Sequence, residues 1–199
     1  MVHEDYAFLS PERNRPIVVA KEFINMSETL LFQTHLLLGY VAWLLCFGVY
    51  VWPRLKAMDP VEAQRAIAVL HSFRFFGLVF ILPGIVGANL PTTFATFAAY
   101  GDFATGILAI LALLAFRIRP LFWLFTIAFN LTGAIDILVD YYHGNQTGLA
   151  DIAGQLGAAY AIPIIYVPLL MITHVAAFYL MVQRAGLRPS AAPLQTHAR

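Results

Sequence analysis

The sequence predicts an all-α fold, a polytopic bundle of five membrane-spanning helices. The first observation is composition, because 60% of the 199 residues are hydrophobic, 12% are charged and the mean hydropathy is +0.74. A soluble domain has about 25% charged residues, so one soluble core cannot absorb this much apolar surface. The second is that the apolar residues gather in five long runs, each near the roughly 20 residues that a helix needs to cross hydrocarbon. The third is that these runs do not alternate in polarity, which argues against transmembrane strands.

Polar, proline and glycine residues bound each run. We place the spans at residues 29–52, 66–88, 94–116, 120–142 and 155–183. The breaks between them are Pro53, Asp59-Pro60 and the short links 89–91, 117–120 and 143–148. The sequence shows no internal repeat. We therefore expect one five-helix transmembrane domain over residues 29–184, with an N-terminal tail (1–28) and a C-terminal tail (185–199).

The N-terminal tail is expected to be disordered. It lacks the apolar stretch of a signal peptide, so it is not predicted to direct secretion. Met26 directly precedes Ser27, Glu28 and Thr29, which are typical of a helix start. We hypothesise that residues 1–25 are an extension, and that a native chain beginning at Met26 is the alternative.

Basic residues predict the orientation. They occur in the first loop, the third loop and the C-terminal tail: Arg54, Lys56, Arg65, Arg117, Arg119, Arg184, Arg188 and Arg199. The second and fourth loops contain no Lys or Arg. Cytoplasmic loops of membrane proteins carry an excess of Lys and Arg. We therefore expect the C-terminus in the cytoplasm and the N-terminus outside, in a multi-pass protein of a bacterial inner membrane.

Three ionisable residues fall at membrane depth, namely Arg74, Asp102 and Asp136. Each costs roughly 2.5–3.5 kcal/mol to insert, so such residues usually face the bundle interior. Other polar residues join them inside the spans: His35, Asn130 and His174. On helical wheels, all of these except His174 are placed on a stripe with small residues, which mark close helix contacts in lipid. Asp140 continues the Asp136 stripe and is placed at the end of the fourth span.

Depth along the helices predicts a pairing. At about 1.5 Å rise per residue, Asp102 and Asp136 both lie about 9–12 Å below the outer boundary. Arg74 starts about 12 Å above the inner boundary and can reach either acid, which lowers the cost of both charges. We expect a polar pocket that opens outward, lined by His35, Asp102 and Asp136 and closed below by Arg74.

The fifth span contains two prolines. Pro163 and Pro168 each remove a backbone hydrogen bond and free a carbonyl four residues earlier. The freed carbonyls can line a cavity at a hinge, with Tyr160 and Tyr166 as pocket walls. The alternative is a static bend that these two tyrosines fill.

Several chemistries are disfavoured by the residues present. A net charge of +1 without a basic cluster argues against nucleic acid, and the lone Cys46 excludes an internal disulfide or a CxxC site. No local spacing supports a metal, so no metal and no cofactor are expected. Haem b stays open as an alternative, although His35, His71 and His174 are offset by about 6–7 Å in depth on ideal helices.

One short segment resembles a catalytic motif. Tyr100, Gly101 and Asp102 resemble part of the GxGD motif of intramembrane aspartyl proteases. Ala99 stands where that motif has its first glycine, and Ile135 precedes Asp136 where the family has tyrosine. The resemblance covers three residues, so we assign the chain to no family from its sequence and name no catalytic residue.

The leading hypothesis is a non-enzymatic membrane protein that binds or moves a small solute or a proton. Asp102 and Asp136 would respond to protons or cations, with Arg74 as counter-charge or anion contact. The first alternative is an accessory subunit of a membrane complex, whose charges only fix helix packing. The second is a membrane enzyme that uses acid/base chemistry on a lipid-like substrate. Expected partners are the bilayer and a small-molecule ligand, with a homo-oligomer or a larger complex both open.

Overall fold

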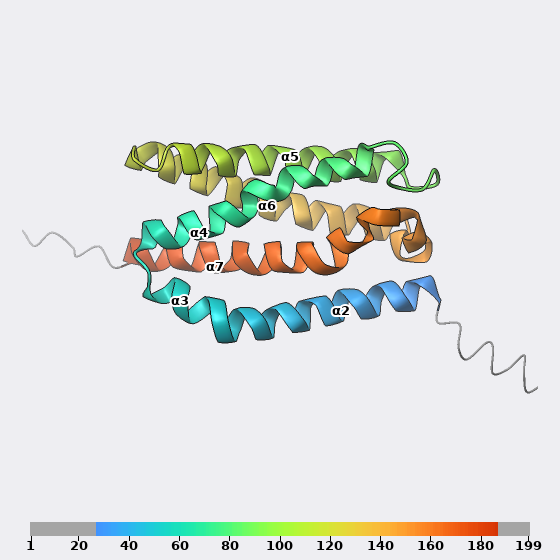
Figure 1. The fold of residues 1–199 in the computed structure, drawn as a ribbon, viewed down its shortest axis with the longest axis horizontal. Helices are drawn as coiled ribbons and strands as arrows, with labels where there is room; N and C mark the ends of the chain where they lie inside the picture. Colours follow the sequence, from blue (N-terminus) through green and yellow to red (C-terminus); the bar gives the residue numbers. More distant parts are fainter. Residues whose placement is uncertain (1–26, 187–199) are drawn as a thin grey trace, which may run out of the picture.

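The protein is a bundle of long helices that lie side by side (Figure 1). The computed structural model describes residues 27–186, and no strand occurs among them. With η marking 3-10 and π-helical segments, the elements are α2 (Glu28–Cys46), η2 (Phe47–Val51), α3 (Trp52–Ala57), α4 (Pro60–Ser72), η3 (Phe73–Ile81), α5 (Thr92–Leu114), α6 (Arg119–Gln146), η4 (Leu149–Tyr160), η5 (Ile162–Tyr166) and α7 (Val167–Gly186). The all-α prediction is confirmed for the described residues.

Five helical stretches are long and apolar enough to cross a membrane. They are Glu28–Ala57, Pro60–Ile81, Thr92–Leu114, Arg119–Gln146 and Ile162–Gln183, which confirms the predicted number of spans. The predicted tails, 1–28 and 185–199, lie almost entirely outside the described residues. The helix start predicted at Ser27 is present, because its Oγ accepts a hydrogen bond from the Leu30 N–H at 3.2 Å.

The predicted ends of three spans are wrong. The first span continues through Pro53 to Ala57, because the π-helical turn η2 precedes the proline. The second begins at Pro60, not 66, and ends at Ile81, ahead of a turn in which Gly84 has φ of +82°. The hydropathy pattern places the start of the second span too late, because the first turn of α4 is polar. The fourth span runs on to Gln146 instead of ending at 142.

The predicted start of the fifth span, at residue 155, is also too early, because the span begins at Ile162. Residues 155–161 belong instead to a folded end segment that we call the cap, consisting of residues 82–91 and 147–161. Its two parts pair through their backbones, with Gly87 N–H donating to Gln155 O at 2.7 Å and Ala158 N–H donating to Ile85 O at 3.3 Å. Gly157 permits this pairing, because its φ is +53° and a Cβ there would collide with the Ile85 carbonyl.

The cap covers one end of the bundle, where α2 begins (Figure 1). Glu28 accepts a hydrogen bond from the Gly154 N–H at 3.1 Å, and Thr29 donates to Asp151. The start of α2 is therefore held against η4. These contacts join residues more than 100 positions apart, which fixes where the first helix lies.

Helix α2 forms the edge of the bundle. Only 6% of its most apolar window is buried, against 33–39% for the other four spans. It packs against η4, η5 and α7, whereas α5 packs between α4–η3 and α6. Most side chains of α2 therefore face outward.

The basic loops meet at the end of the bundle opposite the cap (Figure 1). The Arg65 guanidinium lies over the Phe116 ring, 4.4 Å from its centroid, which joins the first and third loops. Lys56 lies over Trp52 at 5.7 Å in the same region. The basic residues of the first and third loops, from which the orientation was predicted, therefore lie together at one end of the folded bundle.

Candidate functional site

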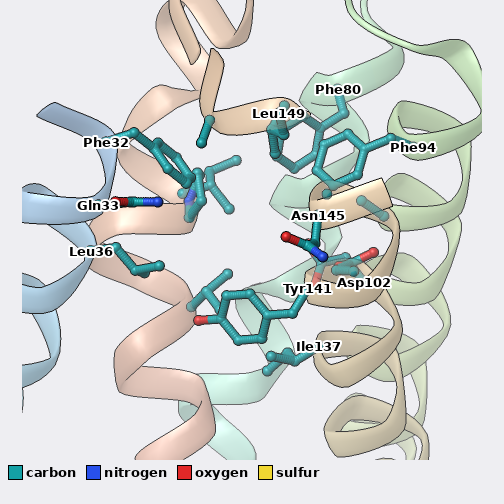
Figure 2. A pocket seen from close by; sticks show the side chains of 17 residues that line it. Phe32, Gln33, Leu36, Phe80, Phe94, Asp102, Ile137, Tyr141, Asn145 and Leu149 are labelled. Carbon is teal, nitrogen blue, oxygen red and sulfur yellow. The ribbon is translucent and has the colours of Figure 1, made fainter. Parts of the chain in front are cut away.

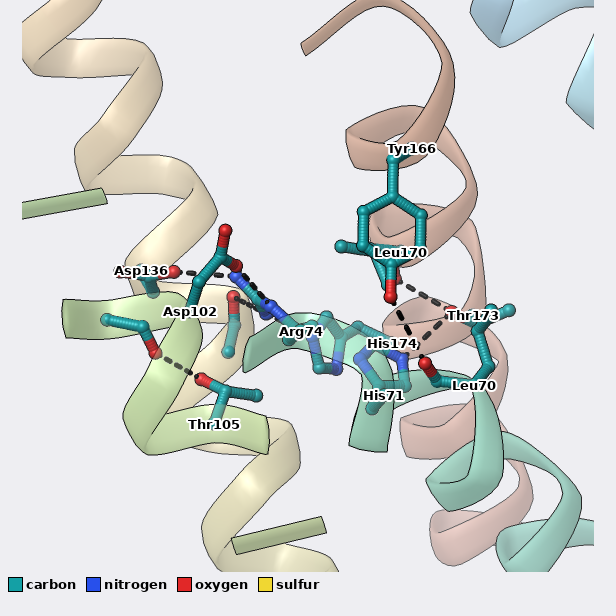
Figure 3. A network of polar contacts seen from close by, with 12 residues as sticks. Leu70, His71, Arg74, Asp102, Thr105, Asp136, Tyr166, Leu170, Thr173 and His174 are labelled. Atoms are coloured by element: carbon teal, nitrogen blue, oxygen red, sulfur yellow. Dashed lines mark hydrogen bonds and ion pairs between the residues drawn. The ribbon is translucent and has the colours of Figure 1, made fainter. Parts of the chain in front are cut away.

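Arg74 is buried at the centre of the bundle on the 3-10 segment η3. The three-residue repeat of a 3-10 helix places Arg74, Gly77 and Phe80 on one buried face. The Arg74 side chain is 1% exposed, with Nε donating to Asp102 Oδ1 and Nη2 donating to Asp136 Oδ2, each at 2.6 Å (Figure 3). The pairing that depth predicted is confirmed, and it engages both acids at once.

Glycines make room for the two carboxylates. A Cβ on Gly77 would collide with the Asp102 carboxyl group, and one on Gly101 would collide with that of Asp136. The acids therefore lie directly against the backbone of neighbouring helices. Close backbone approach through small residues is the usual packing mode inside membranes.

The other side of the guanidinium reaches α6 and α7. Nη1 of Arg74 donates to the Gly133 carbonyl at 3.1 Å and lies 3.3 Å from Nε2 of His174. His174 Nδ1 lies 2.9 Å from Asn130 Oδ1, and the Asn130 amide donates to Thr126 O at 2.9 Å. We call Arg74, Asp102, Asp136, Asn130 and His174 the Arg74 network, which links all four inner spans.

A cavity of about 280 Å³ lies on the cap side of the Arg74 network. Its wall is mostly apolar, and its polar side chains are Gln33, Asp102, Asp140, Tyr141 and Asn145. The remaining lining residues are Phe32, Leu36, Phe80, Phe94, Ala98, Ile137, Gly144, Leu149, Ala150, Ile162, Pro163 and Val167 (Figure 2). Gln33 and Asn145 are exposed, so the cavity reaches the surface between α2 and α6.

The deep end of the cavity, away from the cap, is bounded by a tyrosine pair and by Asp102. The hydroxyl groups of Tyr40 and Tyr141 are 2.8 Å apart and bridge α2 to α6. The carboxyl group of Asp102 belongs both to the cavity wall and to the Arg74 network. The cavity therefore meets the buried ion pairs at this one residue.

The profile of a protein family described as "Domain of unknown function (DUF8737)" matches residues 31–182. The chain belongs to this family. The matched region contains every residue of the Arg74 network and every residue that lines the cavity. Comparisons with curated proteins and with solved structures gave no match.

Only part of the pocket predicted for this DUF8737 member is present. Asp102 lines the cavity, but Asp136 does not, and neither does His35, which is exposed and lies on the face of α2 that meets the cap. The ring of His35 bonds instead to the Tyr160 hydroxyl at 2.9 Å. His35 therefore contacts a neighbouring segment, but that neighbour is the cap, so its predicted place in the pocket wall is wrong.

The two predicted wall tyrosines lie elsewhere. Tyr166 donates to the Leu70 carbonyl at 3.2 Å and borders a separate apolar groove along η3 (Figure 3). Tyr160 packs against Phe32, with ring centroids 6.0 Å apart, and is not part of the cavity lining. The aromatic wall comes instead from Phe32, Phe80 and Phe94, which polarity could not single out.

Asp140 is the cavity residue that the sequence argument undervalued. It was placed at a span end, but α6 continues to Gln146 and Asp140 lines the cavity. Its four-residue spacing from Asp136 was the signal that could have found it. Within residues 27–186 it makes no ion pair, and its Oδ1 is buried without a hydrogen-bond partner.

The bend in the fifth span is tied to α2. Trp43 Nε1 donates to the Ile165 carbonyl at 2.8 Å, and Gly39 packs against the Ile164 carbonyl. Pro168 removes the helical hydrogen bond to Ile164 O, so α2 covers the group that the proline frees. The carbonyls freed here contact a neighbouring helix rather than line the cavity.

The histidines do not have the predicted offsets. The rings of His71 and His174 lie with centroids 4.1 Å apart and tilted by 37°, because α4 begins earlier and carries His71 deeper. Rings this close leave no space for a porphyrin between them, and both nitrogens of His174 are engaged. Among the described residues, no group of three His, Cys, Asp or Glu side chains is arranged to hold a metal ion.

The network dictates the tautomer of His174. A guanidinium can only donate, so Nε2 of His174 must accept from Arg74, and Nδ1–H donates to Asn130. We expect ¹⁵N NMR of histidine-labelled protein at neutral pH to show His174 protonated at Nδ1 and unprotonated at Nε2. The signal is assigned to His174 by its loss in the His174→Gln variant. A His174 signal from the Nε2–H tautomer would contradict this hydrogen-bond pattern.

Proposed function

We propose that this protein binds a small solute in the cavity between α2, α5, α6 and the cap. The observation that carries the proposal is a cavity of about 280 Å³ with an apolar wall and two carboxyl groups. Small-molecule sites are typically concave, largely apolar and supplied with a few placed polar groups. The deep end of the cavity meets the Arg74 network, and its mouth is near the surface.

The localisation that we propose is a bacterial inner membrane, with the cap and the N-terminus outside. The basic loops at the opposite end support this orientation through the positive-inside rule. Both parts of the cap lack Lys and Arg. A solute would then reach the cavity from the outer half of the membrane.

Arg74 acts as a counter-charge rather than as a solute contact. At least four of its five N–H groups have an acceptor in Asp102, Asp136, Gly133 or His174. Its side chain is 1% exposed, so an anion has no access to it. Binding is therefore the function that the geometry supports best. Moving a solute or proton onward would require the Arg74 network to open, and transport is the second step of the proposal.

A structural role is the competing candidate, favoured by the saturation of Arg74. If the buried charges only hold the helices together, the protein could serve as an accessory subunit of a membrane complex. Purification from native membranes in a mild detergent separates the two: stable association with other proteins supports the accessory role. A lone monomer or homodimer supports a self-contained binding protein.

Filling the cavity should abolish binding. Ala150 lies in its wall, so Ala150→Phe places a ring in the space that a solute would occupy. We expect compounds that raise the Tm of the wild-type protein in detergent to lose their effect on this variant, because a ligand stabilises only the state it binds. The measurement is a thermal-shift screen with cationic, neutral and anionic small molecules.

The control is Ala158→Phe, an equal change at an exposed position of the same cap. Compounds should stabilise this variant as they stabilise the wild type. A compound that stabilises both variants equally binds outside the cavity. A screen in which no compound stabilises the wild type would contradict the proposed function.

A further inference from the structure

The cavity is acidic, and nothing within its wall balances that charge. Asp102 and Asp140 line it, and none of the described lining residues is Lys, Arg or His. An anion in this space would meet two carboxyl groups and no cation. An anionic solute and ionised carboxyl groups would repel each other strongly here, because the surroundings have a low dielectric constant.

Among residues 27–186, one cation is paired with this group of three acids. Arg74 pairs with Asp102 and Asp136, which leaves Asp140 without an ion pair among residues 27–186. Asp140 lies one helical turn from Asp136 on the same face of α6, so a negative charge on Asp140 would be opposed by that of Asp136. A bound cation would remove this imbalance, and a carboxyl group left unpaired inside a membrane is costly.

The rest of the wall suits an organic cation rather than a metal ion. Phe32, Phe80 and Phe94 surround the space, and the Tyr141 ring faces it from α6 (Figure 2). Aromatic faces attract cations by their electron density, with the larger effect when the cation is desolvated. Calcium or magnesium would need six or more oxygen ligands, which this apolar wall does not offer.

We propose, building on the proposed function, that the solute is a small organic ammonium ion with an apolar body. Its N–H groups bond to the Asp140 carboxyl group, with Asp102 adding attraction from the deep end. Its hydrocarbon part packs among Phe32, Phe80 and Phe94. The cavity volume of about 280 Å³ limits the solute to a single ring or a short chain.

Three probes of matched shape test the charge preference: benzylamine, benzyl alcohol and benzoate. Each is titrated calorimetrically into full-length protein in detergent, with empty micelles as the blank. We expect benzylamine to bind at least about tenfold more tightly than benzyl alcohol, since hydrogen bonds to charged groups are the stronger ones, and benzoate to bind least.

Asp140→Asn should lower the affinity for benzylamine by about tenfold or more and leave benzyl alcohol unchanged. Glu62→Gln is the matched control, because it removes the same charge at an exposed position near the basic loops. The Tm of Asp140→Asn is not expected to fall, since the variant removes an unpaired carboxyl group and disturbs no ion pair.

Equal binding of benzylamine and benzyl alcohol to the wild type would overturn the ammonium proposal, as would benzylamine affinity that Asp140→Asn leaves unchanged. In either case the cavity could still bind other solutes, which the Ala150→Phe comparison reports independently. If thermal-shift screening finds no ligand and benzylamine also fails to bind, both proposals are wrong.

Discussion

Replacing Arg74 by methionine is expected to destabilise the protein by about 3–5 kcal/mol, the usual cost of removing one partner of a buried ion pair. The variant leaves Asp102 and Asp136 in the bundle interior without the guanidinium that bonds to both at 2.6 Å. It also removes the donor to the Gly133 carbonyl. Methionine preserves much of the volume, so the loss reports charge and hydrogen bonding rather than a cavity.

The free energy of unfolding of the purified protein in detergent, and the amount that accumulates in the membrane, measure this effect. Arg54→Met is the control, because Arg54 is exposed, hydrogen-bonds to the Tyr50 carbonyl and makes no ion pair among the described residues. Combining Arg74→Met with Asp102→Asn and Asp136→Asn should recover part of the stability, since the unpaired charges are then gone. An Arg74→Met variant as stable as the wild type would show that the network does not hold the bundle together.

Arg74→Lys should recover only part of the loss. Arginine forms a planar fork whose Nε and two Nη atoms reach Asp102, Asp136 and Gly133 in different directions. Lysine offers one nitrogen, which cannot occupy all of these positions. Wild-type stability in this variant would mean that charge alone, without the fork, is sufficient.

Gly133→Ala is expected to cost about 1–3 kcal/mol, the range for inserting a methyl group into a packed interior. The new Cβ would lie 2.5 Å from Arg74 Nη1, 2.6 Å from His174 Nε2 and 2.7 Å from Thr105 Cγ2. Arg74 and His174 are held by hydrogen bonds to other helices, and the Thr105 hydroxyl bonds to the Gly101 carbonyl, so making room would break a bond or a contact. In an exposed helix the same change would be favourable, because alanine is the better helix former.

The matched control is Gly48→Ala in the first span, where no heavy atom lies within 4 Å of the new Cβ. We expect its unfolding free energy to equal or exceed that of the wild type. Thermal and denaturant unfolding of both variants in the same detergent make the comparison. If the two alanine variants prove equally stable, the interior around Gly133 can relax more than its packing suggests.

The ion pairs at the centre of the site could be predicted, because a charge buried in a membrane needs a partner of opposite charge at the same depth. Arg74, Asp102 and Asp136 are expensive in hydrocarbon, and their depths allowed few partners. Their pairing followed from the position of each residue along its own helix. The same argument placed Asn130 and His174 in the interior, where His174 accepts from Arg74 and Asn130 bonds to His174.

The cavity could not be predicted because it depends on how the helices rotate and end. Because α6 runs one turn beyond its predicted end, Asp140 lies within the helix and lines the cavity, not at the end of the span. His35 and Gly39 share a stripe that faces the cap and the fifth span, where His35 bonds to Tyr160 and Gly39 packs against Ile164, so His35 does not reach the cavity. The cap, which closes one end, relies on backbone pairing between residues about 70 positions apart.

The sequence by itself determined the class, the number of spans and the central ion pairs of this protein. These properties follow from local sums of hydrophobic transfer free energy and from the cost of charges at a given depth, both of which can be evaluated one helix at a time. The tertiary structure alone decided that Asp140 and three phenylalanines share a cavity with Asp102, while His35, Tyr160 and Tyr166 do not. Which residues share the cavity depends on how each helix is rotated and on contacts between distant segments. In lipid, shape and hydrogen bonding select these contacts, because hydrophobicity does not drive helices together there.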